Sequence, residues 1–460
     1  MKSNSLIEAD RAHLIHPVSA YRAHEARGAT VLVKGDGMYL TDADGNRLLD
    51  AFAGLWCVNV GYGQESIVEA AARQMRELPY ATGYFSFASE ASIRLAERLA
   101  ELSPAGLDRV YFSLGGSDAV DAAIRFIVHY WNARGRPAKK AMIALEKGYH
   151  GSSSTSAGLT GLPAFHRQFD LPLKWQHHIR APYSYRDPEG HDGEALIAAS
   201  VAQLRAKVAE IGQDNVAAFF CEPIQGSGGV IVPPPGWLKA MRETARELDI
   251  LFVVDEVITG FGRTGPMFAC EHEGVTPDLL TVAKGLTAGY APMGAVLMSD
   301  AVYAGIADGP DNHLQIGHGQ TYSGHPVSAA VGLEVLRLYT DGGILANGQA
   351  RGPRFAERLD RLRDHPLVGE VRYKGMLAAI ETVADKRTRA KFQPSLEIGE
   401  RIGRAGYQSG IIYRAFADGI VGLAPALSCG EDDLELMMDR IEAALDRVLD
   451  QPEVRSAVSG

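Results

Sequence analysis

Lys284 is the only charged residue in a stretch of apolar and small residues, 279–296, with the sequence LLTVAKGLTAGYAPMGAV. Two interpretations fit this isolated charge. The ammonium group could reach water along its alkyl stem, because the tips of lysine side chains usually stay exposed. Alternatively, the amine lies in a dry pocket that lowers its pKa and makes it a nucleophile toward a carbonyl group. Other parts of the chain must decide between the two.

The sequence GGSD at 115–118 is a candidate place for a phosphate. It joins an apolar segment, 110–114, to a segment with apolar residues at helical spacing, 118–131. Backbone N–H groups and the Ser117 hydroxyl at a helix N-terminus favour an anion. The alternative is that Ser117 or Asp118 only caps the helix. The loop is not a Walker sequence and not the GxGxxG of nicotinamide dehydrogenases.

Asp255 lies near the end of an apolar segment, ILFVVDEV at 250–257. A carboxylate in such a buried segment needs a partner. The partner could be a helix end or a nearby arginine such as Arg263. The other interpretation is that Asp255 holds the N–H⁺ of a heterocycle, which a pyridinium cofactor requires if its ring is to withdraw electrons.

Two Gly-rich loops carry further candidates. Tyr149 and His150 precede the sequence GSSSTSAG. They belong to a polar loop, with His150 in a core hydrogen bond, or Tyr149 stacks on a flat ligand. Thr321 lies in the turn GHGQTYSGHP, where Ser323 could cap a helix or the turn could contact a phosphate.

Trp56 and Arg414 complete the set of candidates. Trp56 lies in a loop after a predicted small sheet, and Arg414 lies at the end of an apolar segment. Arg414 could form a structural ion pair. Alternatively, its planar guanidinium binds the carboxylate of a substrate.

Short apolar segments alternate with helical ones through the middle of the chain. We predict strands at 110–114, 141–145, 217–224, 250–257 and 279–284, and helices at 118–131, 192–211 and 236–248. This alternation indicates an α/β fold with a mainly parallel sheet flanked by helices. Ligands of such sheets bind at the carboxyl ends of the strands, where Lys284 and Asp255 lie.

A second, smaller domain is expected from both ends of the chain. Residues 31–52 alternate like a small sheet, and the last part mixes helices with short strands before an amphipathic helix at 431–449. We predict a small-domain segment at 1–64, a large domain at 65–326 and the rest of the small domain at 327–460. The 460 residues are 46% hydrophobic, which is enough for both cores.

Charge and cysteine content narrow the class of protein. The 46 Lys and Arg and 56 Asp and Glu give a net charge of −10, which argues against nucleic acid as a partner. Cys57, Cys221, Cys270 and Cys429 are far apart and suggest neither a disulfide framework nor a metal site. The polar N-terminus does not resemble a signal peptide, and no apolar run approaches the length of a membrane span. We therefore expect a soluble, cytoplasmic protein.

These candidates together match what pyridoxal 5′-phosphate (PLP) needs from a protein. PLP needs a phosphate loop, an acid for its ring nitrogen, an aromatic side chain to stack on its ring and an isolated lysine. On these motifs the chain resembles the class III aminotransferases of PLP fold type I, and among them the ω-transaminases that use pyruvate. The strongest match runs from LFVVDEVITGFGRTG (251–265) through PDLLTVAKGLTAGYAPMGAV (277–296). The motifs GGSDAVDAAIRF, GYHGS, EPIQGSGGVIVPP and GQTYSGHP support it. The resemblance covers nearly the whole chain and implies the two-domain fold described above.

The resemblance implies roles at the cofactor. Lys284 would be the Schiff-base lysine and then the base that moves a proton, and Asp255 would pair with the pyridine nitrogen. The other residues expected to contact the cofactor are Gly116, Ser117, Tyr149, His150, Glu222, Val257 and Thr321. In this family Thr321 would reach the phosphate of the neighbouring subunit. A homodimer with shared active sites is therefore expected, and a tetramer remains an alternative.

The resemblance also implies a substrate pocket. Its expected lining residues are Trp56, Tyr149, Tyr84 and Phe85. Arg414 resembles a movable arginine that binds a carboxylate and swings away for an uncharged amine substituent.

Two departures from the family pattern matter. The phosphate loop commonly has Glu where this chain has Asp118, a shorter acid that should be tolerated. Ser227 stands in EPIQGS at the point where relatives similar to ornithine and GABA aminotransferases carry an acid. Because serine cannot form the ion pair that handles glutamate there, this departure favours pyruvate over 2-oxoglutarate as acceptor.

We therefore expect a PLP-dependent aminotransferase that moves an amino group from an amine or ω-amino acid to a keto acid, with pyruvate favoured. The alternatives are a 2-oxoglutarate-using diamine or ω-amino-acid aminotransferase and a PLP-dependent aminomutase or decarboxylase. A binding protein with an inactive PLP-like fold is disfavoured because Lys284 and Asp255 are intact. A nicotinamide dehydrogenase is disfavoured because the chain has no GxGxxG unit between a strand and a helix.

Overall fold

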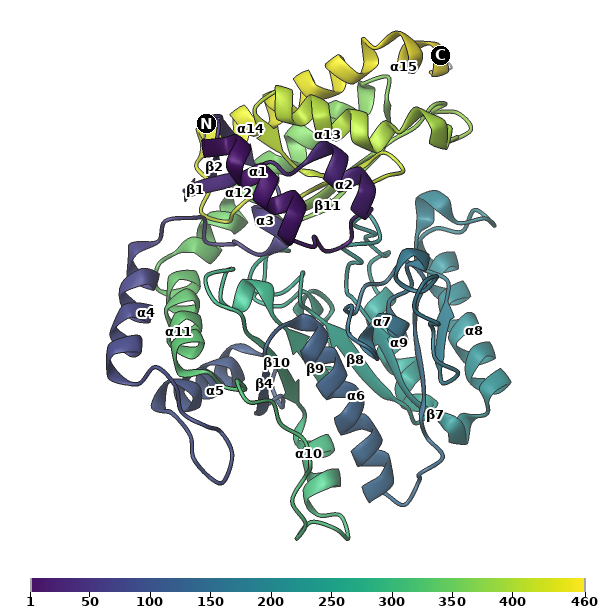
Figure 1. The fold of residues 1–460 in the computed structure, drawn as a ribbon. Coiled ribbons are helices and arrows are strands. Elements are labelled where there is room, and N and C mark those ends of the chain that lie inside the picture. Colours follow the sequence, from purple (N-terminus) through teal and green to yellow (C-terminus); the bar gives the residue numbers. More distant parts are fainter. Residues whose placement is uncertain (1, 459–460) are drawn as a thin grey trace.

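The structure of the protein, a computed structural model, describes residues 2–458. A larger α/β region carries the central sheet, and a smaller region above it contains both ends of the chain (Figure 1).

The larger region is built on a seven-stranded sheet with the order β4-β10-β9-β8-β7-β5-β6. The strands are β4 (Arg109–Ser113), β5 (Ala141–Leu145), β6 (Gln176–Ile179), β7 (Val216–Cys221), β8 (Leu251–Asp255), β9 (Leu279–Val282) and β10 (Gly294–Met298). β10 is antiparallel to both of its neighbours, and all other neighbouring strands are parallel. The predicted α/β fold with a mainly parallel sheet is confirmed.

Strands β6 and β10 were not predicted from the sequence. β6 has the polar sequence QHHI and lies at the edge of the sheet, so it lacks the apolar run that marks a central strand. All five residues of β10 are buried, but they follow directly on the glycine-rich stretch around Lys284. Hydrophobic periodicity alone does not separate so short a strand from other buried segments.

Helices cover both faces of this sheet. The helices of the larger region are α4 (Glu65–Glu77), α5 (Glu90–Leu102), α6 (Gly116–Ala133), α7 (Ser156–Leu159), α8 (Gly193–Ile211), α9 (Trp237–Glu247), α10 (Asp300–Ala307) and α11 (Pro326–Thr340). Strand residues alternate between faces, so Phe220 packs in a cluster with α6, and Phe219 in one with α8 and α9. The helices predicted at 118–131, 192–211 and 236–248 correspond to α6, α8 and α9.

The smaller region joins the two ends of the chain. Its sheets have the orders β1-β2-β3-β13 and β11-β12-β15-β14, and β13 pairs in parallel with β3 through Ile411 and Leu49. Its elements are β1 (Leu32–Asp36), β2 (Tyr39–Asp42), β3 (Arg47–Asp50), α3 (Ala53–Trp56), α12 (Ile344–Arg361), β11 (Val368–Lys374), β12 (Leu377–Thr382), α13 (Ile398–Gln408), β13 (Ile411–Ile412), β14 (Arg414–Ala415), β15 (Ile420–Leu423), α14 (Glu431–Leu449) and α15 (Pro452–Ala457). The small sheet within 31–52 and the helix at 431–449 are as predicted. The exact domain boundaries stay a prediction.

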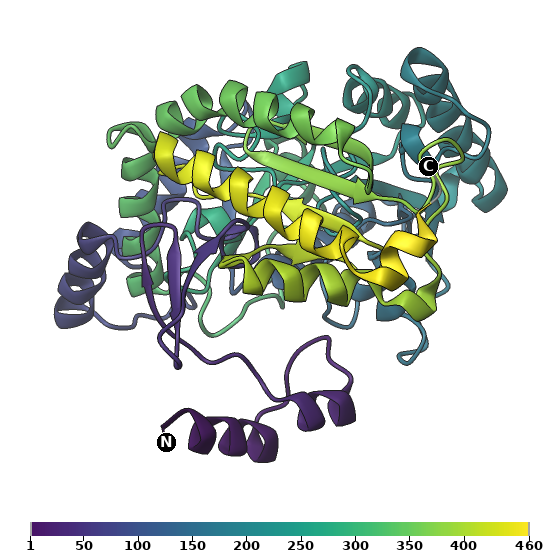
Figure 2. The same cartoon turned by 90° about the horizontal axis from the view of Figure 1, so that it is seen from above.

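The first two helices, α1 (Lys2–His13) and α2 (Tyr21–Arg27), form an N-terminal arm, residues 2–28. Seen from above, the arm stands apart from the body of the molecule (Figure 2). Within residues 2–458, no helix is long and apolar enough to cross a membrane.

Candidate active site

Asp255 and Lys284 come together at the carboxyl edge of the central sheet. Asp255 is the last residue of β8 and pairs with Thr281 of β9, and Lys284 follows β9 by two residues. Since β8 and β9 are parallel neighbours, both side chains lie at the edge where such sheets bind ligands. Lys284 has a φ of 39°, in the left-handed region that residues with side chains rarely adopt. Such strain is common at functional sites.

The surroundings of Lys284 favour an uncharged amine. Its Nζ lies 5.5 Å from the centre of the Trp56 ring. Burial lowers the pKa of Lys284, and the nearby Cys57, Asp255 and Glu222 oppose this only in part. Lys284 is half-buried, so the exposed lysine of the first interpretation is not what the structure shows. A neutral amine in such a place is a nucleophile.

Asp255 pairs with His150, not with Arg263. Asp255 Oδ2 lies 2.9 Å from His150 Nδ1, and Asp255 Oδ1 accepts the Val257 N–H at 3.1 Å. Burial opposes protonation of His150, but the hydrogen bond and charge of Asp255 outweigh it and raise the pKa of His150. Arg263 instead donates to Asn59 Oδ1 and to backbone carbonyls. The carboxylate of Asp255 is thus held in place from one side by a histidine.

Glu222 fixes the backbone that carries Tyr149. Glu222 follows β7 directly and accepts the Tyr149 N–H at 2.8 Å and the Gly226 N–H at 3.0 Å. Burial raises the pKa of Glu222 to about 7, and Asp255 adds to this while His150 opposes it. The Tyr149 ring packs edge-on against Phe165, with ring centres 5.3 Å apart.

The loop before α6 keeps its first N–H groups free of any side-chain cap. The residue preceding the helix is Gly115, and no side chain of the described residues caps the N-terminus. The capping role considered for Ser117 or Asp118 is therefore wrong. Ser117 Oγ instead accepts the Ser152 N–H at 3.1 Å. A Cβ added to Gly116 would lie 3.0 Å from Val257 Cγ1, so a larger residue would have to displace the Val257 side chain.

Asp121, which the sequence analysis missed, ties the Ser-rich loop to α6. It accepts hydrogen bonds from Ser153 Oγ, Thr155 Oγ1 and the Ser156 N–H. The signal was available, because Asp121 follows Ser117 by four residues and so lies on the same face of the helix.

The loop that carries Trp56 is strained and clamped. Ala53, Gly54 and Trp56 all have positive φ. Asp50 accepts the Phe52 N–H at 3.1 Å, the Gly54 N–H at 2.7 Å and the Tyr62 hydroxyl at 2.7 Å. Trp56 is buried, and its Nε1 has no hydrogen-bond partner among the described residues. Asp50 was not recognised from the sequence, where an acid at the end of a strand carries no special signal.

Arg414 lies beside Trp56 without an acidic partner. No residue within 2–458 forms an ion pair with it, so the structural ion pair considered above is absent. Its guanidinium lies over the ring of Phe416 at 4.7 Å, and burial lowers its pKa. A Cβ added to Gly422 would meet Phe416, Arg414 and Trp56 within 3.6 Å. Phe416 was also missed, because nothing in ADGIVG marks the preceding aromatic residue.

Thr321, Tyr84 and Phe85 lie apart from this group in the described chain. Thr321 is exposed, and its carbonyl accepts the Tyr80 hydroxyl at 3.0 Å. Phe85 is 81% exposed, and Tyr84 packs against Gly319. We name the segments 80–87 and 317–325 together the aromatic surface, since they lie side by side and expose Tyr80, Tyr84, Phe85, Phe87 and Tyr322.

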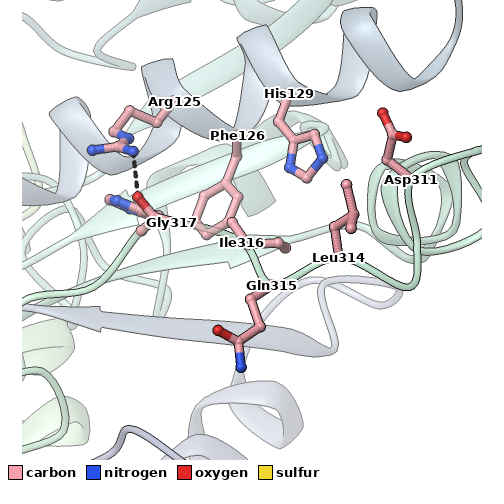
Figure 3. Close-up of a pocket in the computed structure, with 9 residues that line it drawn as sticks. Arg125, Phe126, His129, Asp311, Leu314, Gln315, Ile316 and Gly317 are labelled. Carbon is pink, nitrogen blue, oxygen red and sulfur yellow. Dashed lines mark hydrogen bonds between the residues drawn. The ribbon is translucent and has the colours of Figure 1, made fainter.

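A pocket of about 290 Å³ lies between α6 and residues 311–318 (Figure 3). Arg125 spans it and donates to the Gly317 carbonyl at 2.7 Å. None of the residues that surround Lys284 lines this pocket.

Comparison with known proteins agrees with this geometry. Residues 20–445 match the family described as aminotransferase class-III. The chain belongs to the class III aminotransferases. It is 41% identical to a putrescine–pyruvate aminotransferase of Pseudomonas aeruginosa, over 95% of each chain. It is 39% identical to a diaminobutyrate–2-oxoglutarate transaminase of Halomonas elongata, over 97% of this chain and 96% of the other.

Solved structures of similar proteins have nearly the same fold. The crystal structure of a thermostable (S)-enantioselective ω-transaminase from Thermomicrobium roseum superposes with a TM-score of 0.94. It is 39% identical, with 97% of this chain and 99% of that chain covered. The protein is thus a PLP-dependent aminotransferase of fold type I, and its substrates are a small amine donor and a keto acid acceptor.

The described residues fit PLP. The uncapped N–H groups at α6, with the close approach at Gly116, suit a phosphate. The buried carboxylate of Asp255 suits a protonated ring nitrogen, and the amine of Lys284 suits an aldehyde.

Proposed function

We propose that this aminotransferase moves an amino group from an amine or ω-amino acid to pyruvate. The observation that carries the proposal is Arg414, a cation without an acidic partner among the described residues, on the same side of Gly422 as Trp56, whose ring faces the amine of Lys284. A free guanidinium at this place suits a substrate carboxylate.

We assign the cofactor contacts as follows. The N–H groups of Gly116 and the hydroxyl of Ser117 hold the phosphate, and Asp255, oriented by His150, holds the ring nitrogen. The other residues assigned to the ring are Tyr149, Val257 and Glu222. When bound, PLP supplies an aldehyde that takes up the amino group and a ring that withdraws electrons.

Lys284 then has two tasks in the proposal. With PLP bound, its amine would hold the cofactor through the aldehyde carbon, and the same nitrogen would take a proton from the substrate Cα. The buried surroundings that lower its pKa keep the amine able to accept this proton. Trp56, Tyr149 and Arg414 orient the substrate, and Phe85 is assigned to the same pocket in an assembled dimer.

Pyruvate is the proposed acceptor because of Ser227. Relatives similar to ornithine and GABA aminotransferases carry an acid at this point, and serine cannot form the ion pair that handles glutamate there. The putrescine–pyruvate aminotransferase supports this choice. The diaminobutyrate–2-oxoglutarate transaminase, of similar identity, makes 2-oxoglutarate the second candidate. An aminomutase, which needs no separate acceptor, is the third.

The aromatic surface supports a homodimer. Five aromatic side chains exposed together form the kind of patch that a partner covers. In this proposal Thr321 reaches the phosphate site of the partner subunit. The cytoplasmic location remains a prediction from the sequence.

A half-reaction tests the function. Single amine donors are added to the yellow PLP-loaded enzyme without acceptor, and the cofactor absorbance is followed. Pyruvate and 2-oxoglutarate are then added separately. We expect an ω-amine to bleach the colour and pyruvate alone to restore it. Restoration by 2-oxoglutarate alone would show that the argument from Ser227 is wrong, and product formation without acceptor would indicate a mutase or decarboxylase.

A further inference from the structure

Residues 5–28 of the N-terminal arm contribute no side chain to a hydrophobic core. Among residues 5–28, only Gly28 is buried. Two short helices are not stable together in water without buried apolar surface or another link. Small units of this kind are held by a disulfide, a metal ion or a partner subunit. The arm contains no cysteine, and a metal ion is the link that could join its two helices within one chain.

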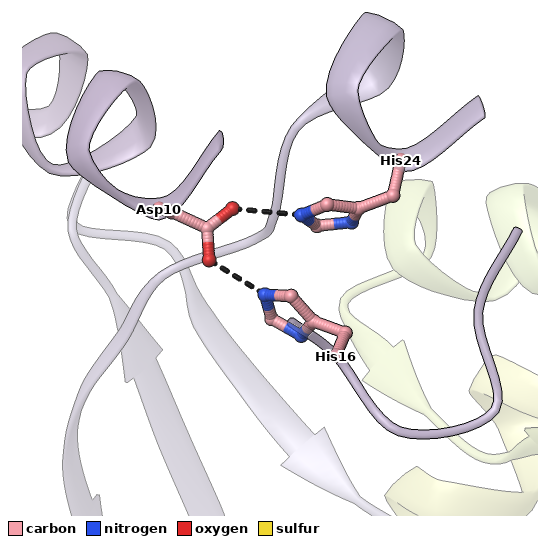
Figure 4. A group of neighbouring side chains, drawn as sticks. All are labelled: Asp10, His16 and His24. Carbon is pink, nitrogen blue, oxygen red and sulfur yellow. Dashed lines mark hydrogen bonds and ion pairs between the residues drawn. The ribbon is translucent and has the colours of Figure 1, made fainter. Parts of the chain in front are cut away.

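Three polar side chains meet between α1 and α2 (Figure 4). Asp10 Oδ1 lies 2.6 Å from His16 Nε2, and Asp10 Oδ2 lies 2.9 Å from His24 Nε2. The two imidazole rings are also in contact, with centres 4.2 Å apart. One nitrogen from each ring therefore points at a different oxygen of the same carboxylate.

We propose that Asp10, His16 and His24 form a binding site for a divalent transition-metal ion of the Zn²⁺ type. One ligand atom from each residue lies within 4.8 Å of the other two. Two imidazoles and one carboxylate are a donor set that zinc accepts. On a tetrahedral ion with bonds of about 2.0–2.1 Å, neighbouring ligand atoms lie about 3.3 Å apart. Each contact with Asp10 must therefore widen by less than about 1 Å.

Metal binding replaces two hydrogen bonds with coordination bonds. Each Nε2 offers its lone pair when the remaining ring proton sits on Nδ1, and any proton displaced from Nε2 is released to water. Asp10 supplies a negative charge, and a fourth position is left for water. The side chains of Asp10 and His24 are 9% and 12% exposed, but that of His16 is 30% exposed. The ion therefore enters past His16 and ties α1 to α2.

Zinc content tests this proposal directly. The tag-free PLP-loaded enzyme is treated with a chelator, incubated with Zn²⁺, passed through gel filtration and analysed for zinc. We expect one zinc ion per chain in the wild type. His16→Ala and His24→Ala should each lose it. His13→Ala, an exposed histidine of the same segment, should keep it and serves as the matched control.

A second measurement separates loss of metal from loss of fold. Each variant should keep the cofactor absorbance and the half-reaction rate of the wild type, because the arm contributes no residue to the proposed active site. In the wild type, Zn²⁺ should also slow tryptic cleavage at Arg22 and Arg27. A wild type that retains no zinc after gel filtration would overturn the proposal. Equal zinc content in the wild type and in a folded His16→Ala/His24→Ala variant would also overturn it.

Discussion

The site combines Lys284, an amine whose pKa is lowered by burial, with two anchored acids. Burial lowers the pKa of the lysine, His150 holds Asp255, and two backbone N–H groups hold Glu222. Each group is therefore positioned before any ligand arrives. Preorganised polar groups need little rearrangement during reaction, which is a large source of rate enhancement.

Lys284→Ala should abolish transamination. Without an amine at this position, both the attack on the aldehyde and the proton transfer are lost, so kcat/KM should fall by at least about 10³-fold. Steady-state rates with the best amine and pyruvate measure this. Lys374→Ala, on the exposed end of β11, is the control. Sustained turnover by Lys284→Ala at more than a few per cent of the wild-type rate would contradict the assignment.

Arg414→Ala should discriminate between substrates. Loss of a charge-assisted hydrogen bond should raise KM for pyruvate by about 10- to 100-fold. The rate at which an uncharged amine bleaches the cofactor should change little, because that substrate has no carboxylate to bind. Arg404→Ala, an exposed arginine on α13, should leave both unchanged. An equal effect on pyruvate and on the uncharged amine would refute a carboxylate role.

Glu222 should make stability depend on pH. Burial raises its pKa to about 7 from an ordinary value of 4.5. The folded state therefore binds this proton more tightly than the unfolded state, and stability is lost as pH rises toward 7. Because Glu222→Gln cannot ionise, the unfolding free energy of wild type minus variant should fall by about 3 kcal/mol between about pH 4.5 and 8.

Urea unfolding over this pH range measures the difference in unfolding free energy between the wild type and Glu222→Gln. Glu69→Gln, an exposed glutamate on α4, should show a difference that does not vary with pH. A constant difference for Glu222→Gln as well would mean that the carboxyl group is charged throughout the range.

At the scale of elements, strand ends and loops set the site. β8 and β9 place Asp255 and Lys284 side by side, and Asp50, at the end of β3, clamps the loop of Trp56. The sequence predicted the parallel strands and α6, because their apolar spacing is set by burial. It did not predict the clamp, since Asp50 acts on backbone N–H groups that only a strained turn brings within reach.

Asp50→Asn should loosen this turn. An amide cannot accept all three hydrogen bonds, so we expect a loss of about 1–3 kcal/mol in unfolding free energy. KM for the amine should rise about 10-fold as Trp56 loses its position, with a smaller change in kcat. Asp44→Asn, exposed in the turn between β2 and β3, is the control. A large loss of stability with unchanged KM would limit Asp50 to a structural role.

At the scale of the whole molecule, more of the fold than of the site could be predicted from the sequence. Lys284, Asp255 and the loop at 115–118 could be singled out from local sequence, because each sits at the end of an apolar strand. The pairing of His150 with Asp255, the stacking of Arg414 on Phe416 and the outward position of Phe85 depend on segments far apart in the chain. No periodicity encodes such contacts.

The aromatic surface should hold two subunits together. Phe85→Asp combined with Tyr322→Asp places two charges where a partner should pack, so the molar mass in solution should fall from dimer to monomer. Activity should fall with it, because Thr321 would no longer reach the partner's site. Light scattering after gel filtration measures the mass. Phe169→Asp changes a phenylalanine exposed elsewhere and should have no effect. An active dimeric double variant would place the interface on another face.

The pairing of β3 with β13 also sets the order in which the enzyme can be completed during synthesis. The loop of Trp56 begins just after β3, and Ala51 donates to the Ile412 carbonyl and accepts the Ala424 N–H. These partners are made more than 350 residues later than Ala51, so the loop of Trp56 is anchored only when the ribosome has nearly finished. Nascent chains released before residue 424 should carry Lys284 and Asp255 yet have no settled position for Trp56.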